Sequence, residues 1–151
     1  MANWAAVIRV LALAVWIGGM VSLDFIEAPL RFGSGVITRN QAVALGQLVI
    51  TRWVWAEWII GAIVVIASLV AAAPRWAVGL VALMLAIVTV QGAFLAPAIT
   101  RLAQGLDFVN RTVDPRYASI RQLHAAYAAL ELIVLVGGMV LLAGQAWPGK
   151  R

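Results

Sequence analysis

Four long apolar stretches alternate with shorter polar connections along the chain. They cover roughly residues 4–28, 53–73, 76–96 and 123–143. Each holds an apolar run of about 20 residues, the length at which an α-helix crosses a hydrocarbon core about 30 Å thick. Because backbone groups find no water in lipid, each run is predicted to be helical. The pattern predicts an all-α integral membrane four-helix bundle of two antiparallel hairpins, one domain over residues 1–151.

Local signals predict where these helices begin. Thr38 and Asn40 are the two candidate N-caps of a helix that continues into the second span. Asp114 followed by Pro115 joins a capping acid to the first helical position, which proline favours. The fourth helix is therefore predicted to start near residue 114, as a cytoplasmic extension outside the membrane.

The segments FIEAPLR (25–31) and FLAPAITR (94–101) resemble each other. Each has a phenylalanine, an Ala-Pro pair and an arginine at the exit of a span. Proline lacks the backbone donor that a helix needs, so Pro29 and Pro97 are predicted to end the first and third helices. We interpret the likeness as a common way of ending a helix, in preference to an internal duplication.

Composition excludes a soluble domain. The chain is 64% apolar and 11% charged, whereas soluble domains are about 45–50% apolar and about 25% charged. A domain this small has too little interior to hide so much apolar surface, so the lipid bilayer is its predicted surrounding. The lack of cysteine excludes disulfides, thiolate metal sites and iron–sulfur clusters.

The net charge of +5 is spread over the connections without a basic run. This pattern favours membrane orientation over nucleic-acid binding, so no nucleic-acid partner is expected. The excess of arginine in the two long connections predicts that they face the cytoplasm of a bacterial inner membrane, with both termini outside the cytoplasm. The residues compared are Arg31, Arg39, Arg52, Arg101, Arg111, Arg116 and Arg121 in the connections, and Arg9, Arg75, Lys150 and Arg151 on the opposite side.

Polar groups within the spans gather at one depth. Charged side chains are costly in lipid and usually face a bundle interior, so each is a candidate for function. Counted along the helices, all of them fall in the cytoplasmic half of the bundle. This predicted polar layer consists of Asp24, Glu27, Glu57, Gln91, His124 and Glu131.

One face of the fourth helix supports this layer. Polar and aromatic residues recur there at a spacing of three and four and therefore point together at the neighbouring helices. They are Tyr117, Ile120, His124, Tyr127, Glu131, Val134 and Gly138. Small residues deeper in the spans are expected to allow close helix contact, namely Gly18, Gly19, Gly137 and Gly138.

Several roles are open to the layer. Carboxylates and a histidine near one another can pass protons or handle cations. His124 is also a candidate axial ligand for a haem or chlorophyll-type tetrapyrrole, although no cofactor is predicted. One histidine with scattered acids is a weak metal signal, so no metal site is predicted. In the purely structural alternative, Glu57 pairs with Arg52, His124 bonds across helices, and Glu131 is protonated or paired.

The tryptophans mark the ends of the spans. Trp4, Trp76 and Trp147 fit the aromatic belts of a membrane protein. Trp53, Trp55 and Trp58 cannot all point the same way on one helix. At least one of these three is therefore expected to face lipid or a partner protein.

Residues 114–144, DPRYASIRQLHAAYAALELIVLVGGMVLLAG, resemble the last helix of a small four-helix integral membrane family of unknown function, which includes the cisplatin-resistance-associated transmembrane protein of animals. Residues 15–32 are similar to its first span, and residues 96–104 to its third-span exit. The turn after His124 is rich in Ala and Tyr, where the family has small polar residues and Asn. The resemblance implies the fold and no mechanism. The matching motif positions are Asp114, Pro115, Arg116, Tyr117 and His124.

The expected function is association rather than chemistry. The sequence has no GxSxG elbow, no HExxH pair and no glycine-rich phosphate loop, so it is predicted not to be an enzyme. The first hypothesis is an accessory or scaffold subunit that packs against other membrane protein subunits. The alternatives are a small transporter or proton- or metal-ion-handling protein that uses the polar layer, and a pigment-binding subunit that uses His124.

Overall fold

The computed structural model describes residues 4–109 and 114–146. They form a bundle of four helices that are long and apolar enough to cross a membrane, as the sequence predicts. The four spans are Trp4–Gly33, Arg39–Val70, Arg75–Ala103 and Arg116–Gly144. The predictions made for Arg111, Trp147, Lys150 and Arg151 lie outside the described residues.

The first and third spans each contain a wide, π-helical turn. The first is made of α1 (Trp4–Val21), η1 (Ser22–Glu27) and α2 (Ala28–Gly33), and the third of α4 (Arg75–Val90), η2 (Gln91–Leu95) and α5 (Ala96–Ala103). The backbone N–H of Ala28 donates to the carbonyl of Leu23, and that of Ala96 donates to the carbonyl of Gln91. Both bonds reach back five residues, the spacing of a π-helix.

These turns correct the expectation that Pro29 and Pro97 end their helices. Each proline lies at the start of the segment that follows a π-helix, and the helix continues to Gly33 in one span and to Ala103 in the other. A proline removes one donor and crowds the carbonyl four residues before it. The wider turn changes the bonding register just before the proline, so the chain stays helical. The likeness of the two segments is therefore a shared device for carrying a helix past proline.

The second span is one continuous helix, α3 (Arg39–Val70). Thr38 is its N-cap, because the Thr38 side chain accepts from the Gln41 N–H and the Gln41 side chain accepts from the Thr38 N–H. The helix ends three residues earlier than the apolar run that predicted it. Ala72 has a φ of 49° in the tight turn that leads to α4, because the hairpin reverses there.

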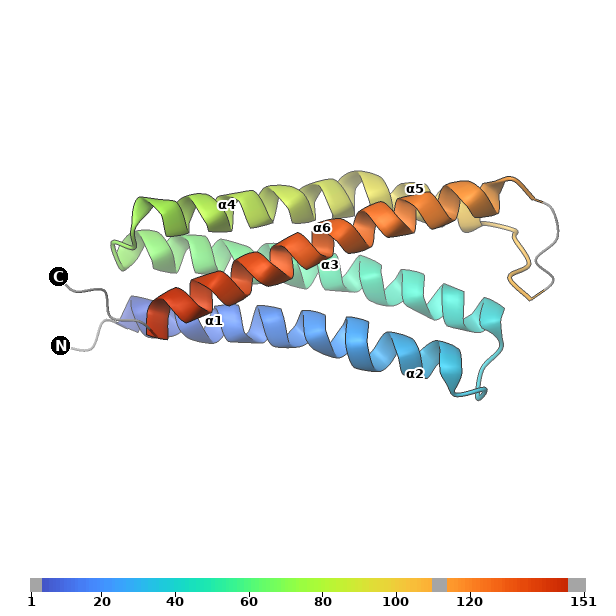
Figure 1. Ribbon diagram of the computed structural model, residues 1–151, viewed down its shortest axis with the longest axis horizontal. Coiled ribbons are helices and arrows are strands. Elements are labelled where there is room, and N and C mark those ends of the chain that lie inside the picture. Colours follow the sequence, from blue (N-terminus) through green and yellow to red (C-terminus); the bar gives the residue numbers. More distant parts are fainter. Residues whose placement is uncertain (1–3, 110–113, 147–151) are drawn as a thin grey trace.

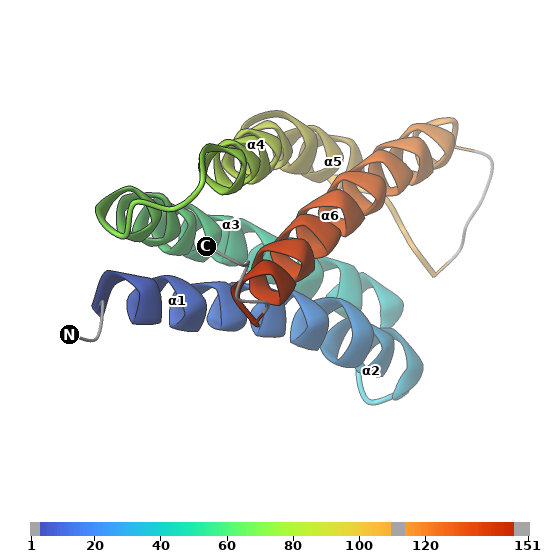
Figure 2. The same cartoon turned by 60° about the vertical axis from the view of Figure 1, so that its left-hand side comes forward.

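The fourth span, α6 (Arg116–Ala146), starts as predicted. Oδ1 of Asp114 accepts a 2.9 Å hydrogen bond from the Arg116 N–H, and the Asp114 carbonyl accepts one from the Tyr117 N–H. This is the capping role that an acid before a helix performs. α6 runs obliquely to the other helices (Figures 1 and 2), packing on α1 and α4 and, at its start, on α5.

The core lies where α1, α3, α4 and α6 meet. Its largest fully buried side chains include Trp16, Leu13, Met20 and Met84. Glycines admit close contacts between helices: for example, the Trp53 ring fills the place of a side chain at Gly19, and Ile17 fills that of Gly138. Gly18 faces open space instead. At the far end, where the long connections lie, α2 and α6 diverge (Figure 1).

Candidate functional site

Three carboxyl groups from three helices lie near one another inside the bundle. The side chains of Asp24 in η1 and Glu131 in α6 are close enough to interact through a hydrogen bond, and Glu57 of α3 lies near both. We call these three residues the carboxyl cluster. A hydrogen bond between two carboxyl groups requires that one of them carries a proton, because two carboxylates offer only acceptors. The cluster therefore has the parts of a proton-holding site.

Glu57 is held by a tryptophan rather than by an arginine. Its carboxylate Oε1 accepts a 3.0 Å hydrogen bond from Nε1 of Trp16, and only 3% of Glu57 is exposed. The expected pair with Arg52 is wrong, because among the described ion pairs Glu57 has none and Arg52 lies on the exposed side of α3. The structure thus places Glu57 deeper than an interfacial ion pair.

Gln91 belongs to the same layer but bonds to the backbone. Its Nε2 donates a 3.1 Å hydrogen bond to the carbonyl of Tyr127, one helical turn before Glu131, and Gln91 is almost fully buried. Asp24 and Glu27 lie in η1 and Gln91 begins η2, so both π-helical turns carry residues of the polar layer. Such turns are frequent at functional sites because they redirect side chains.

The depth of the cluster follows from helix geometry. Glu57 lies about 20 Å along the axis from Val70, and Glu131 about 20 Å from Gly144, at the usual rise per residue. Counted from these ends, both lie within the length of a hydrocarbon core about 30 Å thick. The cluster therefore lies within the helices that are long and apolar enough to cross a membrane.

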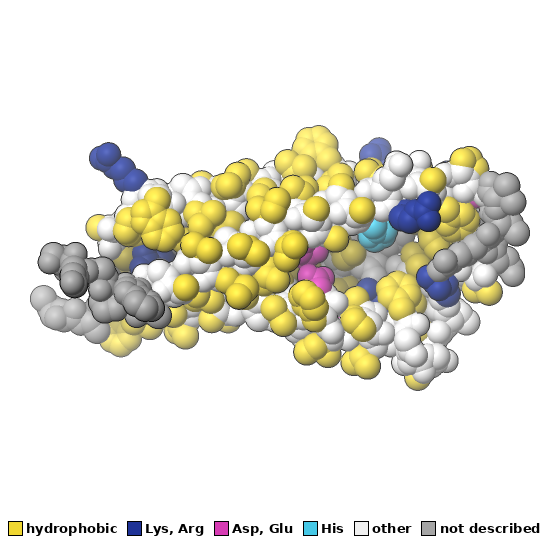
Figure 3. Space-filling view, viewed as in Figure 1, with side chains coloured by type: hydrophobic (Ala, Val, Ile, Leu, Met, Phe, Trp, Pro, Cys, Tyr) yellow, Lys and Arg dark blue, Asp and Glu magenta, His cyan; other side chains and the backbone are white. Residues whose placement is uncertain are grey.

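A cavity of about 250 Å³ opens beside the cluster. It is lined by Asp24, Glu27 and Glu131 and, on the side of the long connections, by Arg31 and His124. Glu27 does not join the cluster, because it forms an ion pair of 3.3 Å with Arg31 one turn along the helix. Figure 3 shows acidic side chains and the single histidine along one hollow of the surface.

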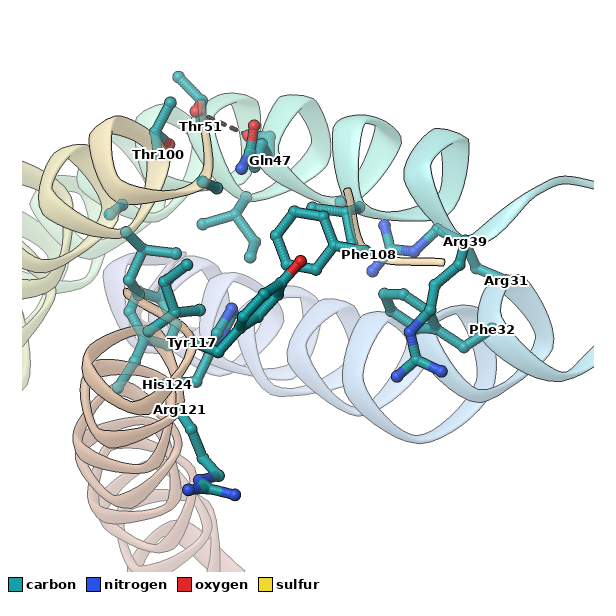
Figure 4. Close-up of a pocket in the computed structure, with 18 of the residues that line it drawn as sticks. Arg31, Phe32, Arg39, Gln47, Thr51, Thr100, Phe108, Tyr117, Arg121 and His124 are labelled. Carbon is teal, nitrogen blue, oxygen red and sulfur yellow. Dashed lines mark hydrogen bonds between the residues drawn. The ribbon is translucent and has the colours of Figure 1, made fainter. Parts of the chain in front are cut away.

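A second, larger cavity of about 710 Å³ lies between α2 and α6. Three arginines line it, Arg31, Arg39 and Arg121, together with Phe32 and Phe108. Figure 4 shows Arg31, Arg39 and Phe32 at one side of this space and residues of α6 at the other. We call it the arginine cavity. The arginine cavity is lined by more basic than acidic side chains, whereas the smaller cavity is lined by more acidic than basic ones.

The two cavities adjoin. Their walls share Arg31, Phe32, Ile50, His124 and Tyr127. His124, the candidate axial ligand, thus stands at the boundary between them, exposed to this space rather than bonded across helices. Together the two cavities extend from the arginine residues, past His124, to Asp24 and Glu131.

The fourth-helix motif ties a loop to the helix. Arg116 Nη2 lies 2.7 Å from Asp114 Oδ2 and its Nη1 donates to the carbonyl of Gln104, while the Tyr117 hydroxyl donates to the carbonyl of Asp107. The hydrogen bond from the Arg116 guanidinium holds the pKa of Asp114 below its usual range. Asp114 and Tyr117 line the arginine cavity, and these bonds hold them in place.

Ligand geometry argues against a metal centre in the layer. Among the described residues, no group of three or more His, Asp or Glu side chains is placed to hold a metal ion. Asp24 and Glu131 line the same small cavity, and the Glu57 carboxylate accepts its hydrogen bond from the indole of Trp16. The arrangement suits exchange of a proton better than coordination of a cation.

Sequence reasoning missed three parts of the site. It treated Arg31 only as an orientation signal, and it assigned no role to Trp16 or to Gly46, which lies against the Arg31 side chain. The one signal available in the sequence was that Trp16 and Arg31 lie in the same span as Asp24 and Glu27 of the polar layer. Of the lipid-facing tryptophans, Trp55 is 60% exposed, which confirms that the three of α3 do not point the same way.

Comparisons of the chain with family models, curated proteins and solved structures gave no match.

Proposed function

We propose that this protein is a small membrane transporter that handles protons through the carboxyl cluster. The arginine cavity would connect the cluster to the cytoplasmic surface of a bacterial inner membrane, with both termini on the opposite side. The proposal includes no catalytic step. The observation that carries it is that Asp24 and Glu131, from separate helices, line one cavity, with the buried Glu57 of a third helix nearby.

The cost of placing these groups in lipid supports a function for them. A carboxyl at this depth is expensive and is usually retained where it serves a pathway. The Trp16 bond stabilises Glu57 as an acceptor, which leaves Asp24 and Glu131 as the pair that can exchange a proton with the space around it. The adjoining cavities, with His124 at their boundary, supply a route for water or a solute to that pair.

Proton flux into liposomes tests this proposal. The full chain is reconstituted with a pH-sensitive dye inside, and a potassium diffusion potential is applied with valinomycin. We expect the wild-type protein to acidify the lumen faster than protein-free liposomes do. Replacing Glu131 by Gln or Asp24 by Asn should reduce the rate to that of protein-free liposomes, because an amide cannot release a proton.

The matched control is Asp107→Asn. It removes one carboxylate from the loop outside the membrane and keeps the oxygen that accepts from Asn40 and Val109. It should retain the wild-type rate. Equal flux with and without the protein contradicts the proposal, as does an E131Q variant that is folded and keeps the wild-type rate.

Two other roles stay predictions. An accessory subunit would use exposed apolar side chains, such as Trp55 and Phe25, which lipid contact explains equally well. Purification in mild detergent, with mass spectrometry of what copurifies, tests that role. A tetrapyrrole held by His124 would give an absorption band near 400 nm or in the near infrared in the same sample, on the order of one pigment per chain.

A further inference from the structure

The guanidinium of Arg31 is buried next to the arginine cavity with part of its bonding capacity unused. Only 8% of the side chain is exposed. Nη1 lies 3.3 Å from Glu27 Oε1, yet neither Nε nor Nη1 makes a hydrogen bond to the described residues or reaches solvent. Buried donors are normally satisfied, and leaving a charged one unsatisfied costs stability. Beyond the ion pair with Glu27, the described chain therefore leaves part of the donor capacity of Arg31 unsatisfied.

Gly46 on α3 makes room for this group. A side-chain carbon at position 46 would lie 3.0 Å from both Cζ and Nη2 of Arg31. Contacts that short force the guanidinium or the helix to move. The glycine thus allows Arg31 to lie flat against α3 at the wall of the cavity, where the lining residues on α3 continue with Gln47 and Ile50.

The charges around the cavity are unbalanced. Arg39 and Arg121 line it together with Arg31, and Asp114 is the one carboxylate among the described lining residues. Asp114 pairs with Arg116 at 2.7 Å and Arg31 with Glu27 at 3.3 Å, which leaves Arg39 and Arg121 as the cationic lining residues without such a pair among the described residues. An anion that enters the cavity therefore meets an excess of positive charge.

The rest of the wall is apolar. Phe32 and Phe108 line the space together with Ile50, Ile99 and Ile120. Figure 4 shows the rings of Phe32, Phe108 and Tyr117 around the centre of the cavity. With a volume of about 710 Å³, the cavity has the size and the mixed lining of a small-molecule site, mostly apolar with a few placed polar groups.

We propose that the arginine cavity binds an amphipathic anion, with Arg31 as the main ligand of its phosphate or carboxylate head. Arg39 adds a second positive charge, and the aromatic and aliphatic wall covers the apolar part of the ligand. A guanidinium offers paired donors that match the oxygens of phosphate and carboxylate. An acidic phospholipid and a soluble organic phosphate both supply such an anionic head and an organic part.

Binding to the full chain in nanodiscs tests the proposal without any measurement of proton flux. The protein is placed in phosphatidylcholine nanodiscs, and binding of a fluorescent phosphatidic acid is measured by native mass spectrometry and by fluorescence. We expect saturable binding that phosphatidylcholine does not compete for. Arg31→Gln should weaken it by about tenfold or more, the effect of losing a charge-assisted hydrogen bond.

Control variants distinguish binding in the arginine cavity from nonspecific attraction of the lipid to the positive charge of the protein surface. Arg101→Gln removes an exposed arginine at the same end of the bundle that does not line the cavity, and it should leave the affinity within about twofold, as expected for a screened surface charge. Arg39→Gln, at the exposed start of α3, should weaken binding and serves if Arg31→Gln fails to fold. Gly46→Val should weaken it as well, by displacing the guanidinium.

A second arm uses inorganic phosphate as competitor. Arg31-dependent displacement of the lipid supports the anion site, and phosphate binding without lipid binding assigns the same site to a soluble phosphate. Equal affinity in the wild type, R31Q and R39Q, or an equal loss in R101Q, overturns the proposal.

Discussion

Trp16 on α1 donates the hydrogen of its indole Nε1 to the Glu57 carboxylate on α3 over 3.0 Å. Trp16 is fully buried and Glu57 is 3% exposed, so neither group has water as an alternative partner. The bond joins the first two spans at the depth of the carboxyl cluster. The most buried acid of the layer thus accepts its hydrogen bond from a neutral indole and not from a cationic side chain.

Trp16→Phe should destabilise the bundle by about 1–3 kcal/mol, the cost of leaving a buried acceptor unsatisfied. Unfolding by SDS in mixed micelles, followed by circular dichroism, measures this change. Trp55→Phe is the matched control, because Trp55 is exposed, and it should change stability by less than about 0.5 kcal/mol. Adding Glu57→Met to W16F removes the unsatisfied carboxylate and should restore part of the lost stability. If the double variant is no more stable than W16F, the cavity left by the indole, and not the lost hydrogen bond, is the cause.

Two neighbouring glycines should respond differently to alanine. Gly19→Ala places a methyl group in the space of the Trp53 ring and should cost about 1–3 kcal/mol, as overpacking does. Gly18→Ala meets no atom within 4 Å and should be neutral or stabilising by up to about 1 kcal/mol, because alanine favours the helix. The same SDS titration compares them. Equal effects of the two variants would show that α1 and α3 do not pack through Gly19.

The carboxylate of Asp114 should titrate below its ordinary pKa of about 3.9. The Arg116 hydrogen bond lowers the pKa of the folded state, so the stabilising effect is present at neutral pH and is lost only as pH falls through that lowered value. Carbon-13 NMR of the Asp114 carboxyl measures the midpoint. Arg116→Gln should raise it, whereas Arg121→Gln should not. An unchanged midpoint in R116Q contradicts this assignment.

Asn40 should hold the loop that carries Phe108 over the arginine cavity. Its Oδ1 accepts from the Phe108 N–H at 2.7 Å and its Nδ2 donates to Asp107 at 3.1 Å. Asn40→Ala should speed hydrogen exchange at the Phe108 amide by about tenfold, the effect of losing one such bond. Exchange followed by mass spectrometry tests this, with Ser34→Ala in the other connection as control. Unchanged exchange in N40A would mean that other contacts hold the loop.

Features with a local cause could be predicted from the sequence. Apolar runs of membrane length fixed the number of spans, and side chains next to the helix starts identified the caps at Thr38 and Asp114. A cap depends on atoms within three or four residues, so its signal is contained in the sequence around it. The depth of the polar layer was predictable for the same reason, since depth in a helix is distance along the chain.

Pairing across helices was not predictable in this way. Whether Pro29 ends a helix depends on the bonding register of the turn before it, and the π-helical turns changed that register. Which acid meets which partner depends on the rotation and crossing of whole helices. These set Glu57 against Trp16 and not Arg52, and Asp24 against Glu131.

By itself, the sequence determined a four-helix membrane bundle and the level at which its polar groups lie, because both follow from hydrophobicity and distance along single helices. Only the tertiary structure decided that three carboxyls converge, that Arg31 lies buried against Gly46, and that α2 and α6 diverge to form a cavity. These relationships join residues that are far apart in the chain, and only the packing of the helices brings them together.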